Sequence, residues 1–132
     1  MDKLEYIPGD LVMVKKSALQ FAKDKIFKVI SSLSGGFLKV VMLNDGSSTY
    51  SISNNAIRPI PLTPEILEKN GWREEKGDYI NDNYHIKLCE KIDGYSAYKV
   101  VNDTIVWLRD VKSVSNLQHL LFGLGLNSEM EV

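Results

Sequence analysis

The chain has one cysteine, two histidines, four prolines and no apolar run that approaches the length of a membrane span. The single Cys89 excludes an intrachain disulfide and is typical of a reducing compartment. A transmembrane helix needs about 20 consecutive apolar residues, so we expect no membrane partner. The opening residues MDKLEYIPGD lack the apolar segment of a secretory signal. We therefore expect a cytoplasmic protein.

Residues that could carry catalysis or bind a metal are scarce. A metal site needs three or four His, Cys or carboxylate ligands. His85 and Cys89 are four residues apart on a predicted strand, or roughly 13 Å at about 3.3 Å per residue, which is too far to share a metal or a proton. No nucleophile elbow, phosphate-binding loop or dinucleotide fingerprint is present. We expect no catalytic residue, cofactor or metal, and a small enzyme using His119, Glu74 or Glu75 is the third hypothesis.

The net charge of −1 conceals an uneven distribution. Up to Arg58 the chain has eight basic and five acidic residues, and after Arg58 it has eight basic and twelve acidic residues. The change of sign coincides with a proline-rich stretch at 59–64. Such an asymmetry predicts two units with different surfaces, which we place at 1–60 and 61–132. A surplus of three positive charges is a weak indication of nucleic-acid binding.

The first unit has the pattern of a small β-domain. Short apolar runs separated by turn residues predict strands at 11–14, 26–30, 37–43, 49–52 and 56–57. Asn44-Asp45-Gly46 is the strongest hairpin signal, because these residues tolerate the positive φ of tight turns. Ser17–Lys23 fits either one helical turn or a long loop. Five short strands in about 60 residues favour an SH3-like or OB-like β-barrel.

The stretch PIPLTPEILEKNGW predicts a short helix with both ends specified, at 64–69. Thr63 is a good N-cap, and Pro64 at the first helical position has its φ already fixed. Gly71 follows the helix as its C′ residue, where positive φ is required, and Trp72 can then pack back on Leu67.

The remaining chain predicts an antiparallel meander of about 79–108 followed by a helix. Asp93-Gly94 and Asn102-Asp103 are hairpin turns between apolar, alternating segments. Ser113 or Ser115 caps a final helix of about 114–124, after which the tail is expected to fray. An apolar stripe on this helix should pack on the meander and consists of Val114, Leu117, Leu120, Leu121 and Leu124. The second unit is therefore predicted to be α+β, and the whole chain to be mainly β.

Two candidate surfaces emerge from these patterns. Aromatic and basic residues on one sheet face can bind bases or peptide prolines. The predicted barrel carries five such residues, Lys28, Phe37, Lys39, Tyr50 and Arg58. In addition, Phe122 and Leu126 are four residues apart on the other side of the last helix, which favours packing on the first unit or on a second copy.

The blocks RPIPLTPEILEKNGW at Arg58–Trp72 and LQHLLFGLG at Leu117–Gly125 resemble a family of short uncharacterised proteins from gut bacterial genomes, prophages and mobile elements. Relatives carry a Val-His-Glu/Gln step before the last helix, where this chain has Val114-Ser115-Asn116. No role of that histidine is therefore transferred. The family has no established activity, so the resemblance implies a phage or mobile-element setting and no mechanism.

The leading functional hypothesis is a non-enzymatic interaction or accessory protein that binds a protein partner or itself as a homodimer. The alternative is a nucleic-acid-binding module that acts through the basic N-terminal barrel.

Overall fold

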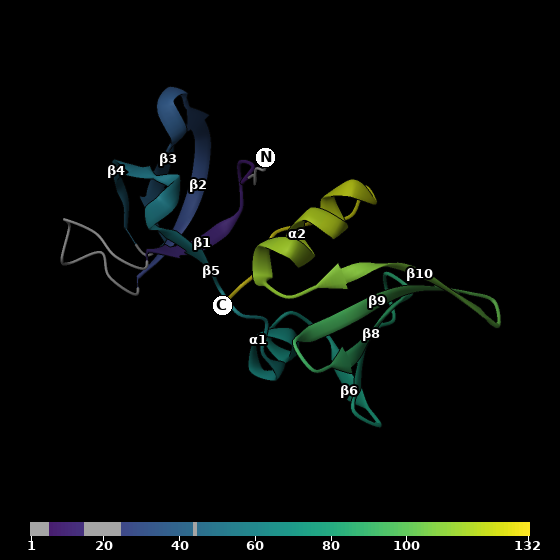
Figure 1. Cartoon of the computed structure of the whole chain (residues 1–132). Helices are drawn as coiled ribbons and strands as arrows, with labels where there is room; N and C mark the ends of the chain where they lie inside the picture. Colours follow the sequence, from purple (N-terminus) through teal and green to yellow (C-terminus); the bar gives the residue numbers. More distant parts are fainter. Residues whose placement is uncertain (1–5, 15–24, 44) are drawn as a thin grey trace. The chain divides into compact units, whose positions relative to one another are not determined.

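The computed structural model describes residues 6–14, 25–43 and 45–132. The chain divides into two compact units, Met1–Ile60 and Pro61–Val132. The predicted turn residue Asn44 and the undecided segment Ser17–Lys23 lie outside the described residues. Within these described residues the chain is mainly β, with two antiparallel sheets and two short α-helices (Figure 1), which confirms the α+β class.

The first unit is a five-stranded antiparallel sheet with the order β4-β3-β2-β1-β5. Its strands are β1 (Leu11–Val14), β2 (Ile26–Leu33), β3 (Phe37–Met42), β4 (Asp45–Ser53) and β5 (Ile57–Pro59). Short 3₁₀ turns connect β2 to β3 (Ser34–Gly36) and β4 to β5 (Asn54–Ala56). Among the described residues β4 and β5 are the two edges, and no closed barrel is found.

One face of this sheet is buried. Directly paired residues lie on the same face, and successive residues alternate between faces. The buried set comes from alternate positions on all five strands and consists of Val12, Val14, Phe27, Val29, Leu38, Val40, Ile52 and Ile57. We call the opposite face the outer face of the first sheet.

Helix α1 (Pro64–Lys69) has the predicted bounds, because its ends are coded locally. The Thr63 hydroxyl accepts a hydrogen bond from the Ile66 amide at 3.3 Å. At the other end the Trp72 amide donates to the Leu67 carbonyl and the Gly71 amide donates to the Glu68 carbonyl. These two bonds form a Schellman motif and confirm the predicted cap.

Replacing Gly71 with valine is expected to destabilise the second unit by about 1–2 kcal/mol, because Gly71 has φ +88° and a β-branched residue is strained there. An added Cβ would meet no atom within 4 Å, so the Cβ itself adds no steric overlap to the backbone strain. Urea unfolding followed by tryptophan fluorescence gives the value. An unchanged midpoint would contradict the cap assignment.

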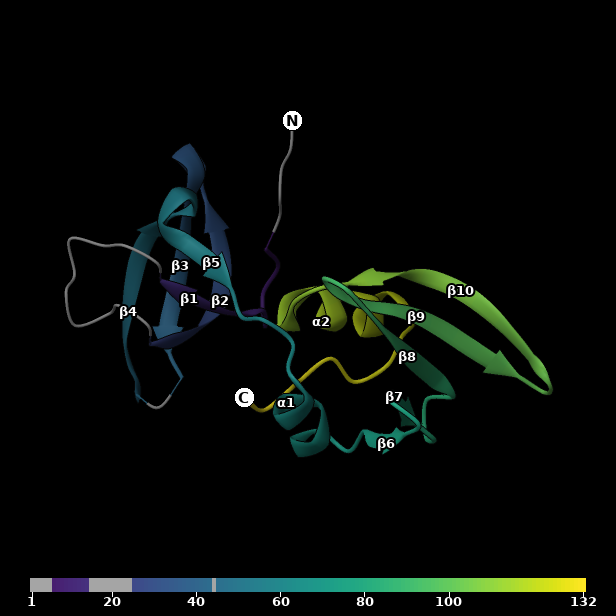
Figure 2. The same cartoon turned by 60° about the horizontal axis from the view of Figure 1, so that its bottom comes forward.

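The second unit contains a five-stranded antiparallel sheet with the order β10-β9-β8-β7-β6 (Figure 2). Its strands are β6 (Arg73–Glu75), β7 (Asp78–Asn81), β8 (Ile86–Lys91), β9 (Gly94–Val101) and β10 (Thr104–Val111). The predicted hairpin turn at 102–103 is present, and the turn predicted at 93–94 lies one residue earlier, at 92–93, because Gly94 pairs with Lys91. Strand β6 begins before the predicted meander of about 79–108 and pairs with β7. Ile92 is fully exposed in the turn between β8 and β9.

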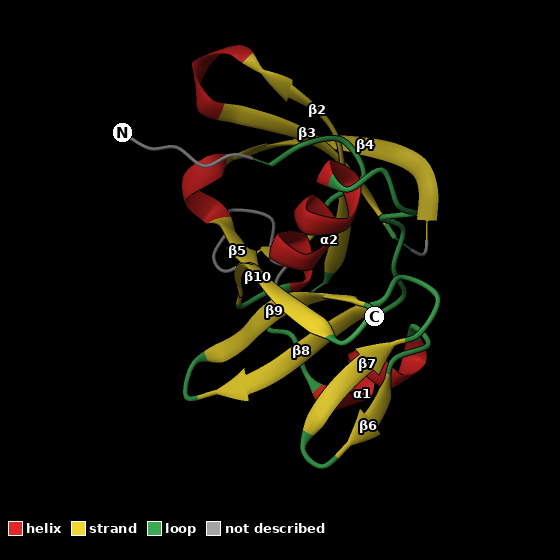
Figure 3. Cartoon of the chain, turned by 90° about the vertical axis from the view of Figure 1, so that its right-hand side faces the viewer, coloured by secondary structure: helices red, strands yellow, loops and turns green. Residues whose placement is uncertain are grey.

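Helix α2 (Val114–Gly123) lies along one face of this sheet (Figure 3). Ser113 is its N-cap, since its hydroxyl accepts the Asn116 amide at 3.1 Å. Four residues of the predicted stripe are buried, and Leu124 is 40% exposed because the helix has ended by that position. The buried face of the sheet is lined by Tyr79, Ile86, Leu88, Tyr95, Ala97 and Val111.

The C-terminal segment is held against α1, so the expectation that it frays is wrong. The Asn70 side chain donates to the carbonyls of Ile66 and Glu131, both at 2.7 Å, and accepts the Glu131 amide at 2.8 Å. Lys69 Nζ donates to the Val132 carbonyl at 3.1 Å. One asparagine thus holds the helix end and the final segment together.

Candidate binding surfaces

The structure places four of the five candidate residues of the first unit on the outer face of the first sheet. Lys28 is opposite Val41, and Lys39 is opposite Ser31 and Ser51, so the two lysines are diagonal neighbours on β2 and β3. Phe37 begins β3 two residues from Lys39 and is 44% exposed. Arg58 pairs with Met13 on the same face but at the β5 edge.

Tyr50 does not belong with the other four residues. It is opposite Val40 and therefore lies on the buried face. Its ring makes an edge-to-face contact with Phe27, with centroids 6.0 Å apart and an interplanar angle of 90°. Tyr50 is therefore half-buried against the core.

Phe122 and Leu126, the candidate self-association pair, have different environments. Phe122 is 65% exposed on α2. The Leu126 amide donates to the Leu121 carbonyl at 2.9 Å, and the Gly125 amide donates to the Phe122 carbonyl at 3.0 Å. Gly125 has φ +75°, so α2 ends in a Schellman motif like α1. Leu126 is the apolar residue that this motif places back over the helix, which leaves Phe122 as the exposed member of the pair.

A row of side chains crosses the outer face of the second sheet, the face opposite the buried one. Direct pairing places Arg73 opposite Ile80, Ile80 opposite Lys87, Lys87 opposite Tyr98, and Tyr98 opposite Trp107. The five strands thus each contribute one residue, and we call this set the cross-sheet row. Trp107 is 57% exposed, and the three central residues are half-buried.

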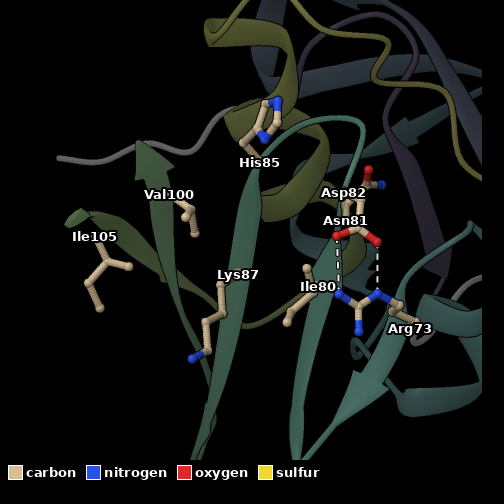
Figure 4. A pocket seen from close by; sticks show the side chains of 8 residues that line it. All are labelled: Arg73, Ile80, Asn81, Asp82, His85, Lys87, Val100 and Ile105. Atoms are coloured by element: carbon tan, nitrogen blue, oxygen red, sulfur yellow. Dashed lines mark hydrogen bonds and ion pairs between the residues drawn. The ribbon is translucent and has the colours of Figure 1, made fainter. Parts of the chain in front are cut away.

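A hollow of about 300 Å³ lies at one end of this face (Figure 4). Its apolar part comes from Ile80, Val100 and Ile105, and its polar rim includes Arg73 and Asp82. Arg73 donates to both carboxylate oxygens of Asp82, at 2.7 and 3.1 Å. These hydrogen bonds hold the pKa of Asp82 below its ordinary value and raise that of Arg73. The guanidinium is thereby fixed in orientation at the rim.

Opposite charges are matched along the rest of this outer face. Lys87 pairs with Asp78 at 3.6 Å, and Lys91 pairs with Asp110 at 2.9 Å. The hydrogen bond from Lys91, followed by one from Ser96, lowers the pKa of Asp110. The outer face of the second sheet is therefore nearly neutral and amphipathic. The first sheet differs, since its other described outer-face positions around Lys28 and Lys39 are apolar or hydroxylated.

The residues considered for chemistry are separated. Cys89 lies on β8, where burial, followed by the charge of Asp78, raises the pKa of its thiol. His85 lies in the preceding turn with φ +57°. Within the described ranges, no three His, Cys, Asp or Glu side chains are close enough to hold one metal ion. In the same part of the chain, no helix is both long and apolar enough to cross a membrane.

Comparisons with protein-family models, curated proteins and solved structures found no match for this chain. The candidate surfaces are therefore defined by geometry alone.

Proposed function

We propose that the protein is a non-enzymatic interaction protein that binds a protein partner through the outer face of the second sheet. The observation that carries the proposal is the cross-sheet row, in which Tyr98 and Trp107 lie beside Lys87 and Arg73 on one open face. Tyrosine, tryptophan and arginine are the residues enriched at the energetic centres of protein interfaces. A neutral amphipathic face with oriented charges suits a protein surface better than a polyanion.

Capture from a lysate of the source cell tests this proposal. Wild-type protein is expected to retain a specific partner, and Lys87→Glu is expected to weaken that retention by about tenfold, because it reverses a charge in the middle of the row. Lys112→Glu makes the same change at a lysine outside the row that is paired with Asp93. Equal retention by all three proteins would refute the proposal, and circular dichroism verifies that each variant is folded.

A second candidate function is single-stranded nucleic-acid binding by the first unit. It is favoured by the outer-face group of Lys28, Phe37, Lys39 and Arg58, which combines cations with an exposed aromatic ring. For this function we keep the SH3-like or OB-like fold of the first unit as a proposal. The cytoplasmic location and the phage or mobile-element setting likewise stay proposals, supported by the single cysteine and by the resemblance.

Fluorescence anisotropy with a labelled single-stranded oligonucleotide decides the second candidate. Binding is expected at low salt and should weaken as salt rises, because phosphate contacts release counterions. Lys39→Glu should weaken it and Lys112→Glu should not. No binding at low salt would exclude this function without affecting the first proposal.

A further inference from the structure

Strand β10 forms one edge of the second sheet, and part of its backbone points outward. The Val100 amide donates to the His85 carbonyl at 2.8 Å, so the polar backbone groups of Val100 point toward β8. Because these groups alternate in direction along an antiparallel strand, those of Lys99 and Val101 point toward β10. Their partners Val106 and Thr104 complete that ladder.

Ile105 and Trp107 therefore direct their N–H and C=O groups to the open edge. Within the described ranges no hydrogen bond uses these outward groups. Such a row of exposed donors and acceptors is a template for pairing with another strand.

The side chains of the same segment are apolar on both faces. Ile105, Val106 and Trp107 are 52%, 50% and 57% exposed, although alternation sends Val106 to one face and the other two to the opposite face. Natural edge strands are usually blunted by charges, proline or bulges. In β10 a bulge and a charged residue are found only from the irregularity between Trp107 and Arg109 onward.

The segment is complementary to itself in one antiparallel register. A two-fold axis perpendicular to the sheet makes the strands of the two copies antiparallel and places the two outer faces on the same side. When Val106 lies on this axis, Ile105 of one copy is opposite Trp107 of the second copy. Both residues direct their backbone groups outward, so each such pair can exchange two hydrogen bonds. Their side chains form an aromatic–β-branched pair, a favourable combination across strands.

The same register also matches charges. It brings Arg109 of each copy beside the 102–103 turn of the other, which carries Asp103.

We propose that the protein forms a homodimer in which β10 pairs antiparallel with β10 of a second copy, with Val106 on the two-fold axis. The two five-stranded sheets then join edge to edge. Trp107 of each copy lies on the single outer face that results. This dimer does not depend on the partner proposed above.

Disulfide trapping tests the register. Val106 would face its own counterpart in a non-hydrogen-bonded pair, where Cα atoms are about 4.5 Å apart and within disulfide range. In a Cys89→Ser background, Val106→Cys is expected to give a product of twice the chain mass on mild oxidation. Ile105→Cys, one residue away, would face Trp107 and should remain uncrosslinked. Equal cross-linking of both variants, or of neither, would overturn the proposed register.

Charge substitutions on the axis test the dimer in solution by light scattering. Wild type is expected at twice the chain mass, whereas Val106→Lys and Val106→Glu should each be monomeric because like charges then face each other. An equimolar mixture of these two variants should recover the double mass. Ile92→Lys introduces the same charge at a fully exposed isoleucine in the turn between β8 and β9, away from β10, and should stay dimeric. Monomeric wild type, or dissociation by Phe122→Asp with Val106→Lys still dimeric, would overturn the proposal.

Discussion

Replacing Gly94 with alanine is expected to destabilise the second unit by about 3 kcal/mol. Gly94 begins β9 with φ +142°, and a Cβ built there would be 2.7 Å from the Val111 carbonyl oxygen and 3.2 Å from the Lys112 Cα. Both atoms belong to the backbone at the end of the neighbouring strand β10, so they cannot rotate away as a side chain could. The cost therefore combines steric overlap with a strained φ, each of which contributes about 1–3 kcal/mol.

Gly77→Ala is the matched control for this prediction. Gly77 also has positive φ, +89°, but a Cβ there would have no atom within 4 Å. Its replacement should cost only the strain, about 1 kcal/mol. Urea unfolding of both variants gives the comparison. A Gly94→Ala loss no larger than that of Gly77→Ala would mean that the turn and the Val111 carbonyl separate at little cost.

Replacing Leu67 with alanine is expected to destabilise the second unit by about 3–4 kcal/mol. Leu67 is completely buried although it belongs to a helix of only six residues. Truncating a buried leucine removes its transfer free energy and leaves a cavity. Helix α1 is too short to be stable alone, so this buried side chain is what binds it to the unit.

The control for this prediction lies on the same helix. Glu68 is exposed, and Glu68→Ala should change the unfolding free energy by less than about 0.5 kcal/mol. Thermal unfolding followed by far-UV circular dichroism compares the two. A Leu67→Ala effect as small as that of Glu68→Ala would show that α1 is not integral to the unit.

Sequence reasoning succeeds where the determinants are local. The bounds of α1 follow from Thr63, Pro64 and Gly71, which act on atoms within a few residues of themselves. The hairpin at 102–103 likewise depends on its own turn residues, and the hairpin predicted at 93–94 is found one residue earlier. Strand β6 could not be predicted this way, because its charged residues Arg73–Glu75 have no strand signal of their own and pair with β7 only through the fold.

The candidate sites show the same division. The sequence alone is enough to exclude Tyr50 from the candidate binding surface. Thr49 and Ser51 are polar, and the alternation therefore places Tyr50 with Ile52 on the buried face. Counting back from the predicted turn at 102–103 aligns Tyr98 with Trp107, as observed. The predicted turn at 93–94 would align Lys87 with Val100, and only the observed turn at 92–93 aligns Lys87 with Tyr98. Extending the row to Arg73 requires the non-local pairing of β6, which no short-range pattern encodes.

The two tryptophans provide separate optical reporters. Trp72, 4% exposed, follows the helix cap, and Trp107, 57% exposed, lies at the sheet edge. Trp72 should emit at shorter wavelength than Trp107 and should be less accessible to acrylamide quenching. Both signals come from the second unit, since the first unit contains no tryptophan. Emission from a Trp72→Phe variant would therefore report events at the β10 edge, and emission from a Trp107→Phe variant would report unfolding of the second unit.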